Sequence, residues 1–451
     1  MNFSSLYNLN LFPIGIKDYL FNPDGEVYMV YAPLAKAFVL IDETSMINIV
    51  ESSHHKKANQ QHHLLQKLVD LNRYEPQAVA LNPGETFALT FLPNNVCNLS
   101  CSYCYASKSH GNTRLDKNSI KQYLDFFIDP NRISRKDLYI SFGGGGEPFL
   151  SWSLVEFAII YASELGNKYG FNINFSFASN GTIVTPAIIQ ILKKYKIKSN
   201  ISFDILERIQ NKERGKYKQV AANLETLLDE DIIPTINSVI TPNNQHLQLE
   251  MVNEIAERFP KIRRLSFDSL VDANYFSTTK EIKEFYKSYT QNFFEARKFG
   301  KTKGITVSCI KHHNLEIIKD RACVGGFDVT PDGEISMCFF VSSPNEKLYN
   351  DFIFGGINKL SGEIKFDKDK YQDLMKYNSD YNNKCKGCLA KWHCGGGCLY
   401  QIKSYSSEMM NEICEFVQSF SIKALMEYID DSLLQEVKSE GMSMIVKVFR
   451  K

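Results

Sequence analysis

Three closely spaced cysteines are the first residues in this chain that could perform chemistry. Cys97, Cys101 and Cys104 follow the pattern Cys-x3-Cys-x2-Cys and come directly after a β-rich run, Ala88–Leu92. Three thiolates in one short loop can hold three irons of a four-iron cluster and leave the fourth iron without a protein ligand. A small molecule can bind at such an open iron. The same residues also suit a zinc knuckle that lacks its fourth ligand.

Polar turns follow the next three β-rich runs. Residues 142–148 read Phe-Gly-Gly-Gly-Gly-Glu-Pro, and glycines there let the backbone approach a ligand closely while the Glu147 carboxylate accepts hydrogen bonds from an ammonium group. An ordinary tight turn is the alternative. The third run ends in Ser179-Asn180-Gly181-Thr182 and the fourth in Ser202-Phe203-Asp204.

A second, denser set of cysteines lies in the C-terminal third. Of 11 cysteines none precedes Cys97, and the later ones are Cys309, Cys323, Cys338, Cys385, Cys388, Cys394, Cys398 and Cys414. An odd number of cysteines, in a chain without secretory features, argues against a disulfide framework and favours metal or redox chemistry. A zinc ribbon is the alternative for this set, because two closely spaced cysteine pairs also suit tetrahedral zinc.

The elements that must position these residues alternate along the chain. We expect six strands, at 88–92, 138–142, 173–178, 200–203, 233–240 and 264–267. Helical patterns lie between and after them, at about 118–128, 152–168, 185–195, 215–229, 246–258 and 279–298. Each return to a parallel neighbour needs a crossover helix, so the pattern predicts an α/β fold with a parallel, partial (β/α)6 TIM barrel. The motifs then meet at the carboxyl ends of the strands, where barrel active sites lie.

Three further segments flank this predicted barrel. Residues 1–83 predict a small α+β unit, with β-rich runs at 26–31 and 37–41 followed by two short helices. Residues 304–420 contain short hairpins, glycine pairs and cysteines, and we expect them to fold around metal. Residues 421–451 predict a helix and a β-rich end. The predicted division is therefore 1–83, 84–303, 304–420 and 421–451.

Composition limits the class of partner and compartment. The chain has 451 residues and a net charge of +1, which gives no general attraction to nucleic acid. No apolar run reaches the roughly 18 residues of a membrane span, and residues 1–11 lack a basic signal-peptide segment. We therefore expect a cytoplasmic protein without a membrane partner. His54, His55, His62 and His63 could hold a metal, but a polar helical surface explains them more simply.

The first cysteine motif, with Tyr103 before its last cysteine, resembles the signature of the radical S-adenosylmethionine enzymes. In that family the open iron binds the amino and carboxylate groups of S-adenosylmethionine, and one electron from the cluster gives a 5′-deoxyadenosyl radical. The Gly-Gly-Glu loop resembles the motif that holds the methionyl amine, and Arg214 falls where relatives place an arginine for the carboxylate. The resemblance implies these cofactor-binding residues: Tyr103, Gly145, Gly146, Glu147, Ser179, Asn180, Ser202, Asp204 and Arg214.

The later cysteines resemble the SPASM pattern, which in that family holds two auxiliary four-iron clusters. The resemblance implies that Cys323, Cys338 and Cys398 hold the first, with Cys309 as its fourth ligand. It implies that the second is held by Cys385, Cys388, Cys394 and Cys414. With the cluster on Cys97, Cys101 and Cys104, the chain would carry three [4Fe-4S] clusters and use every cysteine.

Residues 1–83 resemble the winged-helix peptide-recognition domain of many ribosomal-peptide maturases. The resemblance implies a precursor peptide whose leader docks as an added strand, and a flavodoxin- or ferredoxin-type electron donor. It also implies a radical that installs a thioether or carbon–carbon cross-link, such as a cyclophane; no catalytic base can be named. One alternative is an anaerobic sulfatase-maturating enzyme, although those carry Asp where Phe339 follows Cys338 here. Another is a non-catalytic iron–sulfur electron carrier.

Overall fold

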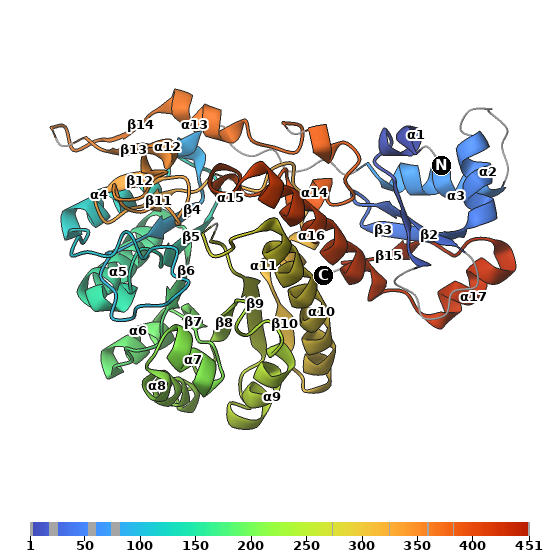
Figure 1. Ribbon diagram of the computed structural model, residues 1–451. Coiled ribbons are helices and arrows are strands. Elements are labelled where there is room, and N and C mark those ends of the chain that lie inside the picture. The colour runs from blue at the N-terminus through green and yellow to red at the C-terminus, as the bar shows by residue number, and fades with distance from the viewer. Residues whose placement is uncertain are drawn as a thin grey trace.

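The computed structural model describes residues 3–17, 26–52, 60–73, 82–272, 274–323, 325–358, 360–381 and 383–449. These residues form an eleven-stranded and a four-stranded sheet, which lie at opposite ends of the molecule in Figure 1. His54, His55 and the side chain of His62 lie outside the described residues. The expectation that these histidines belong to a polar helical surface rather than a metal site is therefore not tested.

The parallel part of the large sheet confirms the predicted strands and adds one. Its strands pair in chain order, all parallel: β4 (Ala88–Phe91), β5 (Asp137–Phe142), β6 (Asn172–Ser179), β7 (Lys198–Ser202), β8 (Thr235–Ile240), β9 (Arg264–Ser269) and β10 (Thr306–Ser308). The unexpected seventh strand, β10, lies beyond the boundary proposed at residue 303. Only three residues long, it shows too little periodicity to be found in the sequence.

Helices connect these strands much as the apolar periodicity indicates. They are α4 (Lys117–Phe127), α5 (Trp152–Tyr169), α6 (Pro186–Lys194), α7 (Glu207–Glu213), α8 (Tyr217–Asp229), α9 (Gln248–Arg258) and α10 (Thr279–Thr302). Several begin at side-chain caps, as where Asp116 accepts from the Ser119 N–H at 2.9 Å. The short helix α7 was not expected, and it ends next to Arg214.

One stretch, Pro148–Tyr169, is long and apolar enough to cross a membrane by length and composition alone. This corrects the expectation that no segment qualifies. Here the stretch comprises a short 3₁₀ turn and α5, which packs against α4 and β6 as a wall of the barrel. A core helix of a soluble protein passes the same test.

The cysteine-rich segment continues the barrel sheet. Its strands are β11 (Asp328–Val329), β12 (Glu334–Ser336), β13 (Ile353–Ile357) and β14 (Ile364–Phe366). β11 pairs parallel with β4, and the other three follow as antiparallel neighbours. Buried side chains such as Val329, Ile335 and Phe354 join the barrel core. The segment thus shares a core with the barrel, where a separate metal-dependent unit was expected.

Short helices carry the remaining cysteine-rich loops. They are α11 (Ile310–Leu315), α12 (Tyr349–Phe352), α13 (Lys368–Met375), α14 (Lys391–Cys394) and α15 (Leu399–Ser404). The longer α16 (Ser407–Met426) runs beside α10 and crosses the boundary proposed at residue 420 (Figure 1).

The small sheet unites both ends of the described chain. Its order is β1 (Phe12–Gly15), β2 (Val27–Ala32), β3 (Ala37–Asp42) and β15 (Val446–Lys447), all antiparallel. One face packs on α1 (Ser4–Tyr7), α2 (Glu43–Ser52) and α3 (Gln60–Leu71). The other packs on α16 and α17 (Asp431–Glu440). Residues 1–83 therefore do not complete this sheet without the C-terminal segment.

Candidate cofactor and substrate site

A cavity of about 640 Å³ lies where the loops after the first barrel strands meet the cysteine-rich segment. Its volume is in the range of small-molecule sites. The walls include most residues predicted to bind S-adenosylmethionine: Tyr103, Gly145, Gly146, Glu147, Ser179, Asn180, Ser202 and Arg214. Six cysteines also line it: Cys97, Cys101, Cys104, Cys323, Cys394 and Cys398. The cavity therefore joins the two cysteine sets that the sequence presents separately.

The first three thiols form one group. Burial raises the pKa of the Cys101 thiol to about 11, with Arg214 opposing the shift. Cys104 and Cys97 also raise the pKa of Cys101, and all three residues line the same cavity. Because thiols bind iron as thiolates, iron binding here would release protons. Within the described residues, no three His, Cys, Asp or Glu side chains converge closely enough to hold a single metal ion.

The glycine loop after β5 fits against the segment that leads into this cysteine group. Gly145 has a φ of +66°, and a Cβ there would lie 2.8 Å from the Asn94 carbonyl oxygen. The N–H of Gly146 donates to that same oxygen at 2.9 Å, and the Glu147 N–H donates to the Val96 carbonyl at 2.8 Å. These glycines are therefore needed for backbone packing as well as for access to a ligand. Asn94, which the sequence analysis missed, is fully buried and secures the loop.

The Glu147 carboxylate fixes the turn after β6. It accepts from the Ser179 hydroxyl at 2.9 Å, the Asn180 N–H at 2.7 Å and the Phe149 N–H at 3.0 Å. Burial raises the pKa of Glu147, and these hydrogen bonds oppose the shift. An ionised carboxylate has about four acceptor positions, so about one is left for a ligand.

The same turn is tied to the cysteine loop. The Asn180 side-chain amide donates to Asn98 Oδ1 at 2.9 Å and lies 3.9 Å from the Cys97 sulfur. Asn98 in turn donates to the Thr182 hydroxyl at 2.8 Å. The predicted turn and the predicted cluster loop are thus held together by side chains.

Asp204 lies behind the cavity wall rather than on it, unlike the other predicted contacts. Its carboxylate accepts from the Tyr103 hydroxyl at 2.6 Å and from the Ser238 hydroxyl at 3.1 Å. Burial raises the pKa of Asp204, and Arg214 opposes the shift. Asp204 therefore orients Tyr103, which lies between Asp204 and the cavity.

Arg214 presents a positive charge to the cavity. Its guanidinium donates to the Tyr103 hydroxyl at 3.0 Å. Burial alone lowers the pKa of Arg214, but neighbouring acidic groups, led by Tyr103, outweigh burial and raise it. The buried Nε of Arg214 has no hydrogen-bond partner among the described residues.

These features fit a four-iron cluster with S-adenosylmethionine beside it. Three thiols stand on one wall, the glycine loop and the Glu147 carboxylate line the same cavity, and Arg214 has an unused donor for a carboxylate. The Cys97 loop would hold the cluster, and Arg214 would bind the carboxylate of S-adenosylmethionine.

The later cysteines divide into two groups. Charges on Cys398 and Cys323 are, after burial, the largest influences that raise the pKa of Cys338. Burial raises the pKa of Cys388 to about 12. Its thiol neighbours are Cys394, Cys385 and Cys414. These are the two sets that the sequence resemblance implies, although their role as cluster ligands stays a prediction.

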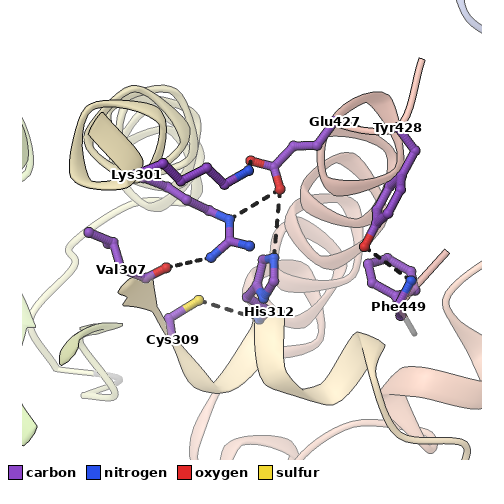
Figure 2. A network of polar contacts seen from close by, with 8 residues as sticks. Lys301, Val307, Cys309, His312, Glu427, Tyr428 and Phe449 are labelled. Carbon is purple, nitrogen blue, oxygen red and sulfur yellow. Dashed lines mark hydrogen bonds and ion pairs between the residues drawn. The ribbon is translucent and has the colours of Figure 1, made fainter. Parts of the chain in front are cut away.

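Cys309 lies apart from both groups. It is 2% exposed and caps α11, where its sulfur accepts from the His312 N–H at 3.4 Å (Figure 2). Burial raises its pKa to about 12, and the largest further influence is Asp268 rather than another thiol. On the other side of His312, Glu427 pairs with Arg297 at 3.1 Å and with Lys301 at 3.4 Å. A ligand role for Cys309 stays a prediction, and its position favours helix capping.

Aromatic side chains line the cavity beside Cys338. Phe339 is 45% exposed and lies 4.6 Å from Phe340 between ring centroids. Tyr105 meets Phe340 edge-on at 4.4 Å. This wall of the cavity is apolar. The sequence analysis named Phe339 but did not predict an aromatic cluster here.

His393 connects the cavity to the small sheet. It lines the cavity next to Cys394, and its Nε2 lies 2.7 Å from the Tyr31 hydroxyl in β2. Its Nδ1 lies 3.1 Å from the Ile317 carbonyl oxygen, so Nδ1 carries the proton and Tyr31 donates to Nε2. Burial lowers the pKa of His393 to about 4, which keeps the ring neutral.

Comparisons with known proteins agree with this geometry. Residues 91–263 match the family model of the radical SAM superfamily. The chain is 24% identical over 430 residues to the radical SAM cyclopropyl synthase TigE of Paramaledivibacter caminithermalis, covering 86% of this chain and 85% of that protein.

Two solved structures share the fold. The structure of anSMEcpe with bound AdoMet superposes with a TM-score of 0.58 at 18% identity, covering 76% of this chain and 98% of that one. Streptococcus suis SuiB bound to its precursor peptide SuiA gives a TM-score of 0.52 at 16% identity, covering 85% and 96%. At these identities the likeness concerns the fold alone.

Proposed function

Because the chain carries a radical S-adenosylmethionine domain, we propose that it modifies a ribosomally made precursor peptide by abstracting a hydrogen atom and installing a cross-link. The observation that carries this proposal is the single cavity that joins the Cys97 loop, the Glu147 loop and Arg214 to the later cysteines. A cavity of about 640 Å³ has room for more than a cluster at its wall.

We propose S-adenosylmethionine and three [4Fe-4S] clusters as cofactors. Cys97, Cys101 and Cys104 would hold the first cluster. The two auxiliary clusters would be held by the group Cys323, Cys338 and Cys398 and by the group Cys385, Cys388, Cys394 and Cys414. A flavodoxin- or ferredoxin-type protein would deliver the electron.

The residues of the chain then have distinct tasks. S-adenosylmethionine bound at a reduced cluster supplies a hydrogen-abstracting radical. Glu147 offers its remaining acceptor position to an ammonium group, and Arg214 pairs with a carboxylate. Asp204 fixes Tyr103, and Phe339 with Phe340 keeps water from the reacting atoms. No base is assigned.

The names of the relatives support a peptide substrate and favour a carbon–carbon bond over a thioether. TigE is named for cyclopropyl formation, and SuiB was crystallised with a precursor peptide. Sulfatase maturation gains no support from this site, because Phe339 follows Cys338 and a phenyl ring accepts no proton.

We also propose that the small sheet docks the leader as an added strand. The described strands place β1 and β15 at its two edges. Residues 441–448 bond along β3, for example through Asp42 N–H to the Gly441 carbonyl at 2.9 Å. We propose the β1 edge for docking, because β1 has four residues and β15 only two. Hydrogen exchange should then show added protection at 12–15 when the precursor is present.

The test of the main proposal is anaerobic reconstitution followed by turnover. About twelve irons per chain are expected for three four-iron clusters. Dithionite and S-adenosylmethionine should release 5′-deoxyadenosine, and a precursor peptide encoded beside the gene should become lighter by two hydrogen atoms. Zinc in place of iron, with no cleavage, would refute the proposal.

A further inference from the structure

Lys319 lies between the two later groups of thiols. It lines the cavity together with Cys323 of one group and Cys394 of the other. Its backbone N–H donates to the Trp392 carbonyl oxygen at 2.8 Å, two residues before Cys394. Lys319 precedes Cys323 by four residues, and this contact also brings it close to Cys394, which lies 75 positions further along the chain.

The two segments meet by close backbone packing. Gly395 has a φ of +63°, and a Cβ there would lie 2.2 Å from the Arg321 carbonyl carbon. The next glycine, Gly396, would place a Cβ 2.5 Å from the Asn378 carbonyl oxygen. No side chain fits at these positions, so the segment that carries Lys319 is held against the segment that carries Cys394 and Cys398.

The acidic groups that act on Lys319 are thiols. The side chain is half-buried, and burial lowers its pKa. The charges that oppose this shift are those of Cys394, Cys323 and Cys398. Within the described parts of the chain, no carboxylate forms an ion pair with Lys319. Lys403, in the same region, is by contrast paired with Asp351 at 3.4 Å.

We propose that Lys319 is a positioning residue that holds a positive charge between the two auxiliary clusters and raises their reduction potentials. Reduction adds one negative charge to a cluster, and a nearby cation stabilises the reduced state more than the oxidised state. The inference rests on the proposed function, because it requires both clusters. The inference adds that the positive charge of Lys319 makes both auxiliary clusters easier to reduce than they would be with thiolate ligands alone.

This role suits the chemistry proposed for the cavity. Cys323, Cys338 and Cys398, and the group with Cys394, would hold clusters that could take up the electron lost when a substrate radical closes to a product, with the proton released to solvent. Lys319 would favour that uptake through its charge. It therefore acts through the clusters rather than as a catalytic residue.

The test compares reduction potentials in reconstituted holoenzyme. All variants carry Cys97→Ala, so that electron paramagnetic resonance detects the auxiliary clusters without the first one. Lys319→Met should shift their midpoint potentials to more negative values. Lys319→Arg keeps the charge and should match the parent, as should Lys403→Met, which removes a surface charge of the same region.

Iron content separates failure of the inference from failure of the proposed function. A parent protein with clearly fewer than about eight irons would refute two auxiliary clusters. Full iron with unchanged potentials in Lys319→Met would overturn the role of Lys319. If Lys319→Met loses iron, Lys319→Gln provides a second neutral variant. Iron loss in Lys319→Met and Lys319→Gln, but not in Lys319→Arg, would support a role for the positive charge. Iron loss in all three variants would overturn that role.

Discussion

The two ends of the cavity are built differently. At the barrel end, side chains hydrogen-bond to one another: Glu147 accepts three hydrogen bonds, and Tyr103 is fixed between Asp204 and Arg214. At the other end, short turns carry the thiols, as where the Cys388 N–H donates to the Cys385 carbonyl at 3.2 Å. The polypeptide thus preforms the first end, whereas we propose that metal completes the second.

The largest expected effect concerns the barrel end. Cys97→Ala removes one of three thiols, so release of 5′-deoxyadenosine should fall to background. Iron bound by the later cysteines should remain, because those groups share no ligand with the Cys97 loop. Iron analysis and deoxyadenosine assay of the same preparation check both parts. If Cys97→Ala still cleaves S-adenosylmethionine, the cofactor does not bind at the barrel end of the cavity.

Iron removal should affect the two ends unequally. After anaerobic chelation, amides at 383–398 should lose protection from hydrogen exchange, because we propose that iron bound to the thiols of these turns holds them in place. The barrel strands β5 and β6 should keep theirs. Equal loss of protection at both ends would contradict the distinction between a preformed and a metal-dependent site.

A substitution at Glu147 tests the hydrogen bonds of the barrel end. Glu147→Gln should weaken S-adenosylmethionine binding about 10- to 100-fold, because hydrogen bonds to a charged group contribute about 1.5–3 kcal/mol. Isothermal titration with the reconstituted protein measures the dissociation constant. Asp116→Asn, a matched change at the exposed cap of α4, should leave the constant unchanged. An unaltered constant in Glu147→Gln would exclude the residue from binding.

The smallest expected effect is at Cys309. Serine caps helices well, so Cys309→Ser should change the free energy of unfolding by no more than about 1 kcal/mol. Its iron content should equal that of the parent. Chemical denaturation and iron analysis check this. Loss of iron would instead make Cys309 a ligand of the first auxiliary cluster, as the sequence resemblance implies.

The sequence predicted the parts of the molecule that rest on periodicity and spacing. Alternating apolar runs located β4 to β9. Spacing alone placed Cys398 with the dense C-terminal cysteines, and its assignment to Cys323 and Cys338 rests on the family resemblance and stays a prediction. The sequence analysis missed β10, because a strand of three residues leaves no periodic signal. The β-rich end expected within residues 421–451 does contain β15. The sequence analysis also missed Asn94. Its carbonyl oxygen accepts from Gly146 and its side-chain amide donates to the Glu147 carbonyl, and such contacts with a loop about 50 residues away leave no pattern in the sequence.

Asp204 shows a different limit. Its position after β7 predicted a direct contact with the cofactor, but residue spacing does not reveal which way a side chain faces once a strand has ended. The Tyr103 hydroxyl donates to the Asp204 carboxylate, and Ser202 rather than Asp204 lines the cavity.

The pairing of β15 with β3 bears on the order in which the molecule is made. During synthesis the first three strands of the small sheet leave the ribosome long before residues 446 and 447 do. Until then β3 has an unpaired edge, and the apolar face that includes Tyr31 lacks α16 and α17. The docking surface that we propose on this sheet would thus be complete only after the residues that line the cavity have also been synthesised.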